Sequence, residues 1–356
     1  MRSGLAARVR KRSAVAALTI ALTPTLSACS NPGSAATSEV AWVTTGASVT
    51  DPGIAVTPVD LDGHRVGTHV PLGSLPSALA YTAGDAGLLV VTRGDDTLHE
   101  IDPATHNVVH TVRVGVEPDA VAVAPGGTGG KGIALVANFD SNTVTPVDLG
   151  TWRAGIPIPV GNQPVAIAVA TPSGPNAKGN AIAFVADFGS NQVTPIMLPA
   201  RLAAAPLAVG PSPQAIATTA GHLLVGNFGD HTLTDINITT ETPPDTVALP
   251  FNPTGIAVPS SARPGPTGVQ AYVCGGAGVV PVRVGGLATL LGHPLTVGTP
   301  IALPNVAQGI ALSRDNATAW VTQQAGSIVP VNVRTRAVGK AVHLGGHPSA
   351  IAIGAG

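Results

Sequence analysis

Cysteine, aromatic and charged residues are scarce in this sequence of 356 residues. The chain has two cysteines, 3% aromatic residues and 10% charged residues, against 44% hydrophobic residues. Cys29 lies in the N-terminal segment considered below, so no disulfide bond is expected within the folded domain. Cys274 follows Tyr272 and Val273, and this apolar setting favours a small buried side chain over a nucleophile.

Metal, cofactor and nucleophile motifs are also missing. The sequence has no His-x-x-His, Cys-x-x-Cys or calcium-loop spacing, no phosphate-binding loop, no dinucleotide fingerprint and no Gly-x-Ser-x-Gly elbow. The side chains that could bind a metal are Asp95 and Asp96, Asp140, and Asp230 with His231, and they fall in different repeats. We therefore expect no metal and no cofactor.

The charge balance argues against nucleic acid as a partner. Residues 1–28 contain five basic and no acidic side chains, so their removal leaves 13 basic against 19 acidic side chains. An acidic chain lacks the basic patches that neutralise phosphates. We expect no nucleic-acid partner.

A repeated pattern fills the rest of the chain. Each copy has an apolar run, a turn rich in Asn, Asp and Gly, a second apolar run and a tail that resembles Gly-x-x-Pro-x-Ala-Ile-Ala. The clearest copy begins at Ala134 and its tail begins at Gly161. Seven tail positions occur, at steps of 42, 46, 49, 40, 54 and 41 residues: Pro76, Pro118, Pro164, Pro213, Pro253, Ala307 and Pro348. This period is that of a four-stranded propeller blade.

The composition of the runs predicts strands. Val, Ile and Thr cluster in runs of four to seven residues bounded by Gly, Pro, Asn and Asp, and no long helical period follows residue 28. The sequence therefore predicts an all-β protein, a seven-bladed β-propeller of four-stranded antiparallel blades. The first copy lacks the strand that opens the others, and the chain ends with it at Pro348–Ile353. We expect this C-terminal strand to complete the first blade and remove an open sheet edge.

The second strand and its turn resemble those of the tyrosine-valine-threonine-asparagine (YVTN) repeat propellers. The motif is degenerate here, as in Leu135-Val136-Ala137-Asn138 and Phe184-Val185-Ala186-Asp187. The resemblance covers roughly residues 40 to 356 and implies the propeller fold. That fold hosts bacterial surface proteins, lactonase-like enzymes and binding proteins, so the resemblance does not extend to one function.

The N-terminus is typical of an export signal. Basic residues precede the apolar stretch Ala14–Ala28, and Leu26-Ser27-Ala28-Cys29 resembles a bacterial lipobox. The resemblance implies a signal peptide over 1–28, lipidation at Cys29, a tether over 29–39 and the propeller over 40–356. The protein would then be exported and held by its lipid on the outer side of the cell membrane. The alternative is an ordinary secretory signal followed by a chance cysteine.

The polar residues that enter each blade, and those in the hairpin between its second and third strands, should meet on one face of a propeller. The candidates for binding a ligand at this face, around the channel mouth, are Asn138, Gln163, Asp187, Asn227 and Asn252. For Asn138, Asp187 and Asn227 the alternative is structural, because Asn and Asp in turns bond their own backbone.

One sector of the mouth has residues suited to catalysis. Arg93, Glu117 and His347 belong to adjacent blades, and a carboxylate, an imidazole and a guanidinium suit general-base hydrolysis of a lactone. The alternative is that water-exposed loops carry such side chains without a catalytic role. No catalytic motif is present, so the sequence favours a monomeric binding module for an unidentified small molecule or protein, with a lactonase-like hydrolase as the alternative.

The lipobox makes a direct prediction. Cys29→Ser should abolish acylation and leave the precursor uncleaved or released from the membrane, while the propeller still folds. Two or three acyl chains anchor a protein stably, whereas one does so only marginally. Mass spectrometry of the mature N-terminus measures the modification. An unmodified terminus in the wild type, or cleavage elsewhere, would show that the segment is not a lipobox.

Overall fold

Short runs of Val, Ile, Thr and Ala between turn residues form the strands of seven antiparallel sheets. The computed structural model describes residues 38–46, 55–72, 75–171, 180–198, 200–219, 221–238, 244–259, 268–276, 278–285 and 295–355, all within the unit Thr37–Gly356. Cys29 and the predicted signal peptide lie outside the described residues. Within the described ranges the helical segments are two short 3-10 turns, η1 (Ala83–Asp85) and η2 (Thr128–Gly130).

The first three blades use both ends of the chain. Strands are given from the innermost outwards, and in several blades the outermost strand is split in two. Blade 1 has β32 (His347–Ala355), β1 (Glu39–Gly46), β2 (Ala55–Asp60), β3 (Arg65–Val66) and β4 (Val70–Pro71). Blade 2 has β5 (Pro76–Tyr81), β6 (Leu88–Thr92), β7 (Thr97–Ile101) and β8 (Val108–Arg113). Blade 3 has β9 (Pro118–Ala124), β10 (Ile133–Asn138), β11 (Thr143–Asp148), β12 (Arg153–Ala154) and β13 (Ile158–Pro159).

The other four blades follow in chain order. Blade 4 has β14 (Pro164–Ala170), β15 (Ile182–Asp187), β16 (Gln192–Met197), β17 (Leu202–Ala203) and β18 (Leu207–Ala208). Blade 5 has β19 (Pro213–Thr219), β20 (His222–Asn227), β21 (Thr232–Asn237) and β22 (Asp245–Ala248). Blade 6 has β23 (Pro253–Ala257), β24 (Val269–Gly275), β25 (Gly278–Val284), β26 (Leu295–Val297) and β27 (Ile301–Ala302). Blade 7 has β28 (Ala307–Leu312), β29 (Thr318–Gln323), β30 (Ser327–Asn332) and β31 (Val342–His343).

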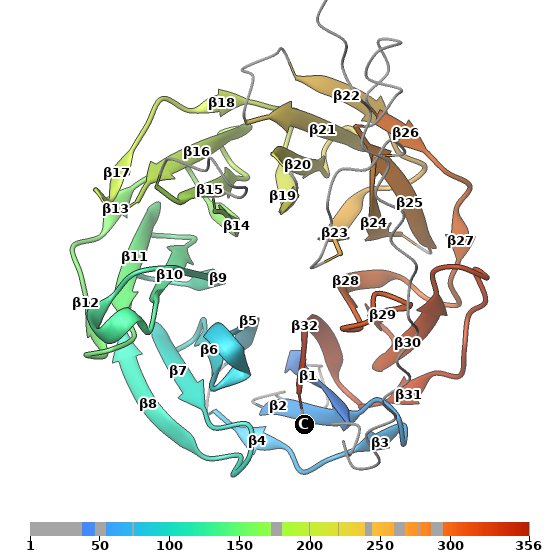
Figure 1. Ribbon diagram of the computed structural model, residues 1–356, viewed down its shortest axis with the longest axis horizontal. Helices are drawn as coiled ribbons and strands as arrows, with labels where there is room; N and C mark the ends of the chain where they lie inside the picture. The colour runs from blue at the N-terminus through green and yellow to red at the C-terminus, as the bar shows by residue number, and fades with distance from the viewer. Residues whose placement is uncertain are drawn as a thin grey trace, which may run out of the picture. The chain divides into compact units, whose positions relative to one another are not determined.

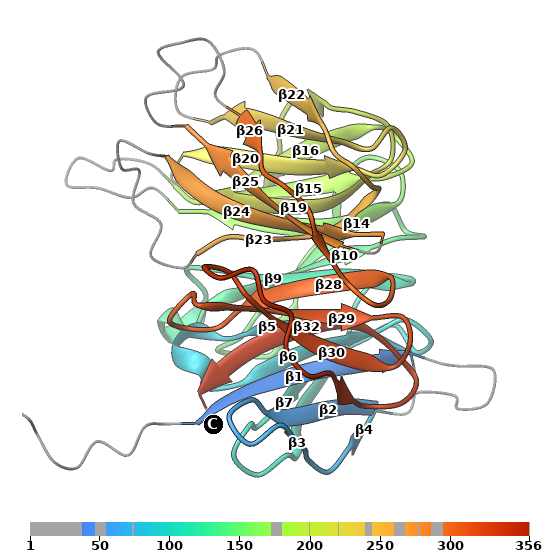
Figure 2. The same ribbon diagram turned by 90° about the vertical axis from the view of Figure 1, so that its right-hand side faces the viewer.

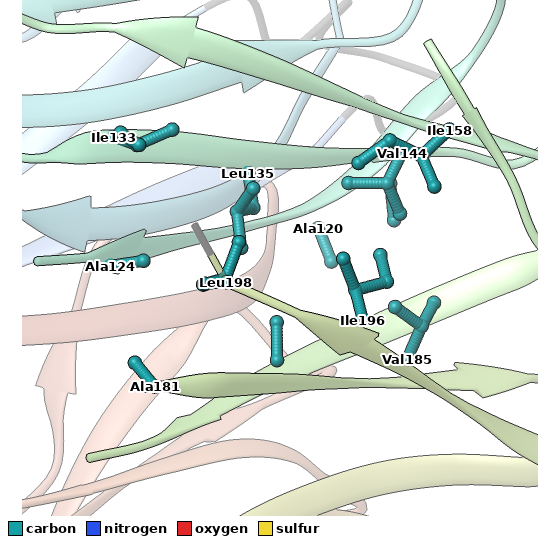
Figure 3. Packing of buried hydrophobic residues seen from close by; sticks show 12 residues of the cluster. Ala120, Ala124, Ile133, Leu135, Val144, Ile158, Ala181, Val185, Ile196 and Leu198 are labelled. Atoms are coloured by element: carbon teal, nitrogen blue, oxygen red, sulfur yellow. The ribbon is translucent and has the colours of Figure 1, made fainter. Parts of the chain in front are cut away.

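The blades surround a central axis, as Figure 1 shows, and they stack face to face in the perpendicular view of Figure 2. Each innermost strand contacts the innermost strand of the next blade, from β5 around to β32. The core is divided among the interfaces between blades. In Figure 3, Leu135 and Val144 of blade 3 pack with Val185 and Ile196 of blade 4. Because both faces of a blade are buried, its strands are apolar and small, as the sequence predicts.

The last strand closes the ring, which confirms the predicted closure. Strand β32 pairs antiparallel with β1, from Glu39 opposite Ala355 to Gly46 opposite His347. Neighbouring blades hold the end of this pair. The amide of Ala355 lies 3.3 Å from Asp85 Oδ2 of blade 2, and that carboxylate also pairs with Arg314 Nη2 of blade 7 at 3.0 Å.

Prolines shape the outer edges of five blades. The fourth position of the third strand is Pro58, Pro146, Pro195, Pro281 or Pro330. Each proline carbonyl accepts a hydrogen bond from an amide of the outer segment, as Pro146 does from Gly155 at 2.7 Å. In blades 2 and 5 the position is Glu100 or Asp235, and the outermost strand is unbroken. Proline cannot donate a ladder hydrogen bond, so the outermost strand breaks beside it.

Contacts between histidine and tryptophan rings join neighbouring blades. His106 lies 5.0 Å from Trp42 and His64 lies 5.7 Å from Trp320, as ring centroids, and both pairs are edge-to-face. Each histidine comes from a hairpin of one blade and each tryptophan from the second strand of the preceding blade. The ring of Trp152 of blade 3 also stacks on His110 of blade 2, at 4.5 Å between centroids, so all three tryptophans in the chain join neighbouring blades.

Removal of the closing strand should destabilise the whole ring. Deletion of 348–356 would unpair β1 and remove Ile351 and Ile353, which pack half-buried against the core of the first blade. Full burial of an isoleucine contributes roughly 1.5–3 kcal/mol, so we expect a loss of several kcal/mol in the free energy of unfolding, with aggregation through the open edge. Urea denaturation and size-exclusion chromatography measure both effects, and a chain without Gly356 alone is the control. An unchanged unfolding midpoint would contradict closure by β32.

Candidate functional site

The links between blades and the hairpins between second and third strands meet at one face, the mouth. Backbone hydrogen bonds join them: Phe139 N–H donates to Glu117 O at 2.8 Å, and Phe188 N–H donates to Gln163 O at 2.9 Å. The same bond joins Phe228 to Ser212 at 3.0 Å. The expectation that links and hairpins share a face is therefore confirmed.

The link residues have a special backbone conformation. Glu117, Gln163 and Ser212 have φ values of 51°, 54° and 53°, in the left-handed region. The amide of each is bonded by the hairpin of the preceding blade: Asn142 Oδ1 accepts from Gln163 N–H at 2.8 Å, and Asp96 Oδ1 accepts from Glu117 N–H at 2.9 Å. The backbone of these residues serves the fold, and their side chains remain available at the mouth.

Three of the predicted binding residues lie beneath this face. Asn138, Asp187 and Asn227 are fully buried at the ends of β10, β15 and β20. Asn138 Nδ2 donates to Thr145 Oγ1 at 2.9 Å, and Asn138 Oδ1 accepts from Gly115 N–H at 3.1 Å. Asn227 Nδ2 donates to the hydroxyls of Thr232 and Thr234. The hydrogen bonds of these asparagines support the structural alternative given above.

Asp187 differs from its two counterparts because it is ionisable. Its Oδ2 accepts a hydrogen bond from Thr194 Oγ1 at 2.5 Å, and its Oδ1 has no hydrogen-bond partner within the described part of the chain. Burial raises the pKa of Asp187 to about 6, while Thr194, the Gly161 amide and Gln192 oppose the rise. This carboxyl therefore titrates near neutral pH.

Arg93 forms an ion pair at the mouth with a residue that the sequence did not single out. Arg93 Nη2 lies 3.1 Å from Asp119 Oδ1, and the guanidinium carbon lies 5.4 Å from the centre of the Phe139 ring. Burial raises the pKa of Asp119, Arg93 opposes that rise and Glu117 adds to it. The structure therefore brings Arg93, Glu117 and Asp119 into one sector.

His347, the third catalytic candidate, is bonded elsewhere. Its Nδ1 lies 2.8 Å from Gln324 O of blade 7. Within the described residues, no hydrogen bond or ion pair joins His347 to Arg93 or Glu117. Of the three proposed catalytic residues, Arg93 and Glu117 therefore lie in the same sector and His347 does not. The acidic group that Arg93 contacts is Asp119.

An open pocket of about 350 Å³ lies at the mouth between blades 3 and 4. Its lining residues are Phe139, Asp140, Asn142, Asn162, Gln163 and Gly189. Gln163 is the predicted binding residue that reaches this pocket with an exposed side chain. Asn252, the remaining candidate, instead donates from Nδ2 to Phe228 O at 2.7 Å.

Sequence reasoning overlooked Asp119 and Asp140 as members of the site, although both depart from the repeat. Asp119 follows the tail proline, where the other copies have Ser77, Val165, Gln214, Thr254, Gln308 and Ser349. Asp140 stands where the next two copies have Gly189 and Gly229. A charged residue at a position that is neutral in the other repeats is the signal that could have found them.

The described residues include no group of three or more His, Cys, Asp and Glu side chains placed to hold a metal ion. Across the same ranges, no helix has the length and apolar character needed to cross a membrane.

Comparisons with known proteins support the fold. No family model and no curated protein matches the sequence. The solved structures that resemble it include a functionally unknown protein from Desulfotomaculum acetoxidans, with a TM-score of 0.71 and 15% identity over 89% of this chain and 98% of that chain. A putative 6-phosphogluconolactonase from Bacteroides fragilis has a TM-score of 0.68 and 14% identity over 91% and 99%. The hydrazine synthase of Kuenenia stuttgartiensis has a TM-score of 0.61 and 16% identity over 77% and 88%. At these identities the likeness shows the propeller fold alone.

The buried carboxyl of Asp187 predicts an unusual pH dependence of stability. Its folded-state pKa of about 6 lies above the ordinary aspartate value of 3.8, so its protonated form stabilises the fold. That stability is present below pH 3.8 and is lost as the pH rises through 6, by roughly 2–4 kcal/mol. Asp187→Asn should therefore raise the free energy of unfolding at pH 7.5, and the gain should disappear near pH 4. Urea denaturation at both pH values measures it.

A reciprocal variant tests the same cause. Asn227→Asp places a carboxyl in the equivalent site of blade 5 and should lower stability more at pH 7.5 than at pH 4. If Asp187→Asn destabilises the protein equally at both values, its carboxyl is not the source of the dependence.

Proposed function

We propose that this protein is a binding module that takes a small, uncharged polar ligand, or the polar surface of a protein partner, at the mouth of its propeller. The observation that carries the proposal is the open pocket lined by Asn142, Asn162 and Gln163 beside the Phe139 ring. Amide groups donate and accept hydrogen bonds in fixed directions, and an aromatic ring offers an apolar face. Few convergent polar groups around a concave surface are typical of ligand sites.

The charge around the pocket narrows the class of ligand. The hairpins and links of blades 2 and 3 carry one arginine, already paired with Asp119, among several acidic residues: Asp95, Asp96, Glu117, Asp119 and Asp140. A negative potential at the mouth repels anions. The structural neighbour described as a putative 6-phosphogluconolactonase has a name that implies a phosphorylated substrate. Phosphate sites commonly use Lys or Arg groups, and the arginine here is paired with Asp119, so this sector favours a ligand without phosphate.

Lactone hydrolysis remains the second candidate function, because Glu117 and Arg93 share one sector with Asp119. The carboxylate of Glu117 would act as general base on water, and Arg93 would stabilise the oxyanion. The Arg93–Asp119 ion pair opposes this role, because it neutralises the guanidinium. Binding without chemistry is therefore the proposal that the geometry supports better.

We also propose that the propeller is carried outside the cytoplasmic membrane by a lipid on Cys29, as a monomer without a nucleic-acid partner. The lipobox-like Leu26-Ser27-Ala28-Cys29 supports the anchor, and the excess of acidic residues after position 28 argues against nucleic acid. The degenerate tetrapeptide at the end of β10, β15 and β20 supports membership of the YVTN-repeat propellers.

Calorimetric titration of the purified protein tests the binding proposal. The panel consists of neutral monosaccharides, cell-wall fragments and unphosphorylated lactones, with 6-phosphogluconate as an anionic comparison. We expect a neutral compound to bind and Gln163→Gly to weaken it at least tenfold, since glycine keeps the left-handed backbone and removes the amide. Ser212→Gly, the same change at the equivalent link of blade 5, is the matched control and should leave affinity unchanged.

The same panel separates binding from hydrolysis. Glu117→Gln should change affinity modestly and alter the free energy of unfolding by about 0.5 kcal/mol or less, whereas Arg93→Ala also leaves the partly buried carboxylate of Asp119 without its ion pair and should destabilise the fold more. A wild-type protein that hydrolyses a lactone, with a rate that falls a hundredfold in Glu117→Gln, would overturn the binding-module proposal in favour of the hydrolase. If Gln163→Gly and the wild type bind the ligand with equal affinity, the ligand does not bind in this pocket.

A further inference from the structure

Asp187 contacts both segments that blade 4 contributes to the mouth pocket. Its backbone leads directly into Phe188 and Gly189, and its carboxylate packs against Gly161, where an added Cβ would lie 2.6 Å from Oδ2. Gly161 leads into Asn162 and Gln163, which line the pocket with Gly189. Two hydrogen bonds join the segments: Gly189 N–H donates to Asn162 O at 3.0 Å, and Phe188 N–H donates to Gln163 O at 2.9 Å.

The surroundings of this carboxylate are uncharged. The groups that bond or polarise it are the Thr194 hydroxyl, the Gly161 amide and the Gln192 side chain. Strands β14, β15 and β16 carry no other ionisable residue, and neither do the link 161–163, the hairpin 188–191 or the next link 209–212. Asp140, in the hairpin of blade 3, is the titratable residue among those that line the pocket. A negative charge on Asp187 therefore has no cationic partner in these elements.

Blade 3 shows how a neutral residue at this position is bonded. Asn138 accepts from the Gly115 amide and donates to the hydroxyls of its third strand, so the link and the hairpin are bonded through one side chain. Protonated Asp187 has one donor and one acceptor and can make the same two kinds of bond. Ionised Asp187 only accepts, and its charge attracts the nearby Gly161 amide more strongly than the neutral acid does.

We propose that Asp187 is a positioning residue for the mouth pocket, and that gain or loss of its proton shifts the link Gly161–Gln163 and with it the shape of the pocket. The ionised carboxylate draws the Gly161 amide toward it and orders the link. Protonation weakens this contact and allows the neutral arrangement that Asn138 has in blade 3. If the pocket binds a ligand as proposed above, that ligand should bind more tightly above pH 6 than below it. This consequence rests on the proposed function.

Amide NMR of the full chain tests the coupling without any ligand. In 1H–15N spectra between pH 4.5 and 8, the amides of Gly161, Asn162, Gln163 and Gly189 should shift together, with a midpoint near the Asp187 pKa of about 6. In Asp187→Asn these shifts should be absent, whereas Asp140→Asn should leave them unchanged. The Gly115 amide, at the equivalent link of blade 3, should not titrate with this midpoint in any of the three proteins.

The reciprocal change adds an independent test. Asn138→Asp should confer on Gly115 and its neighbours a titration that they lack in the wild type. If Asp187→Asn does not fold, Asp187→Thr replaces it, since Thr92 occupies the position in blade 2. A titration of Gly161–Gln163 that persists without the Asp187 carboxyl, or none in the wild type, overturns the proposal. Failure of every panel compound to bind would instead count against the proposed function, because the NMR result does not depend on a ligand.

Discussion

The pairing of β32 with β1 is the contact on which every other interface depends. Each sheet is built from small apolar residues and buries both faces against its neighbours, so no blade has a core of its own. An open array would leave two blades with an uncovered face and one with an unpaired edge. Pairing of the first and last strands covers both faces and pairs the open edge. Asp85 of blade 2 bonds the end of β32 and forms an ion pair with Arg314 of blade 7.

Within this ring, a buried polar group at the end of the second strand stabilises the mouth. Blades 2, 3 and 5 use Thr92, Asn138 and Asn227, and each bonds hydroxyls at the start of the third strand. These bonds satisfy groups that would otherwise be buried without partners, at a cost of about 1–3 kcal/mol each. The hairpins are thereby rigid, and the link residues that they bond are held with their side chains at the mouth.

The repeat determined most of what the sequence could predict. Its period and its prolines located seven blades, and the strand missing at the start of the pattern located the closure, because both are consequences of local residue types. The direction of single side chains was not predictable in this way. Asp119 leaves the regular ladder because a β-bulge follows Pro118, so that Ala137 pairs with Ala120 and Asn138 with Pro118. That one-residue irregularity aims the carboxylate at Arg93, and His347 instead meets Gln324 through the packing of blades 7 and 1.

Residues that depart from the repeat are informative, because the repeat shows which residues the fold itself requires. A propeller needs only neutral groups at the bulge, in the hairpin and at the buried end of the second strand, as the copies with Ser77, Gly229 and Asn227 show. Asp119, Asp140 and Asp187 place carboxylates at these three positions in blades 3 and 4, and two of them have pKa values raised by burial. A buried carboxyl costs stability that a neutral residue would not. Asp187 is buried, Asp119 is half-buried and Asp140 is exposed at the pocket, and the fold requires a carboxylate at none of these positions, which is why the proposed function is placed at blades 3 and 4.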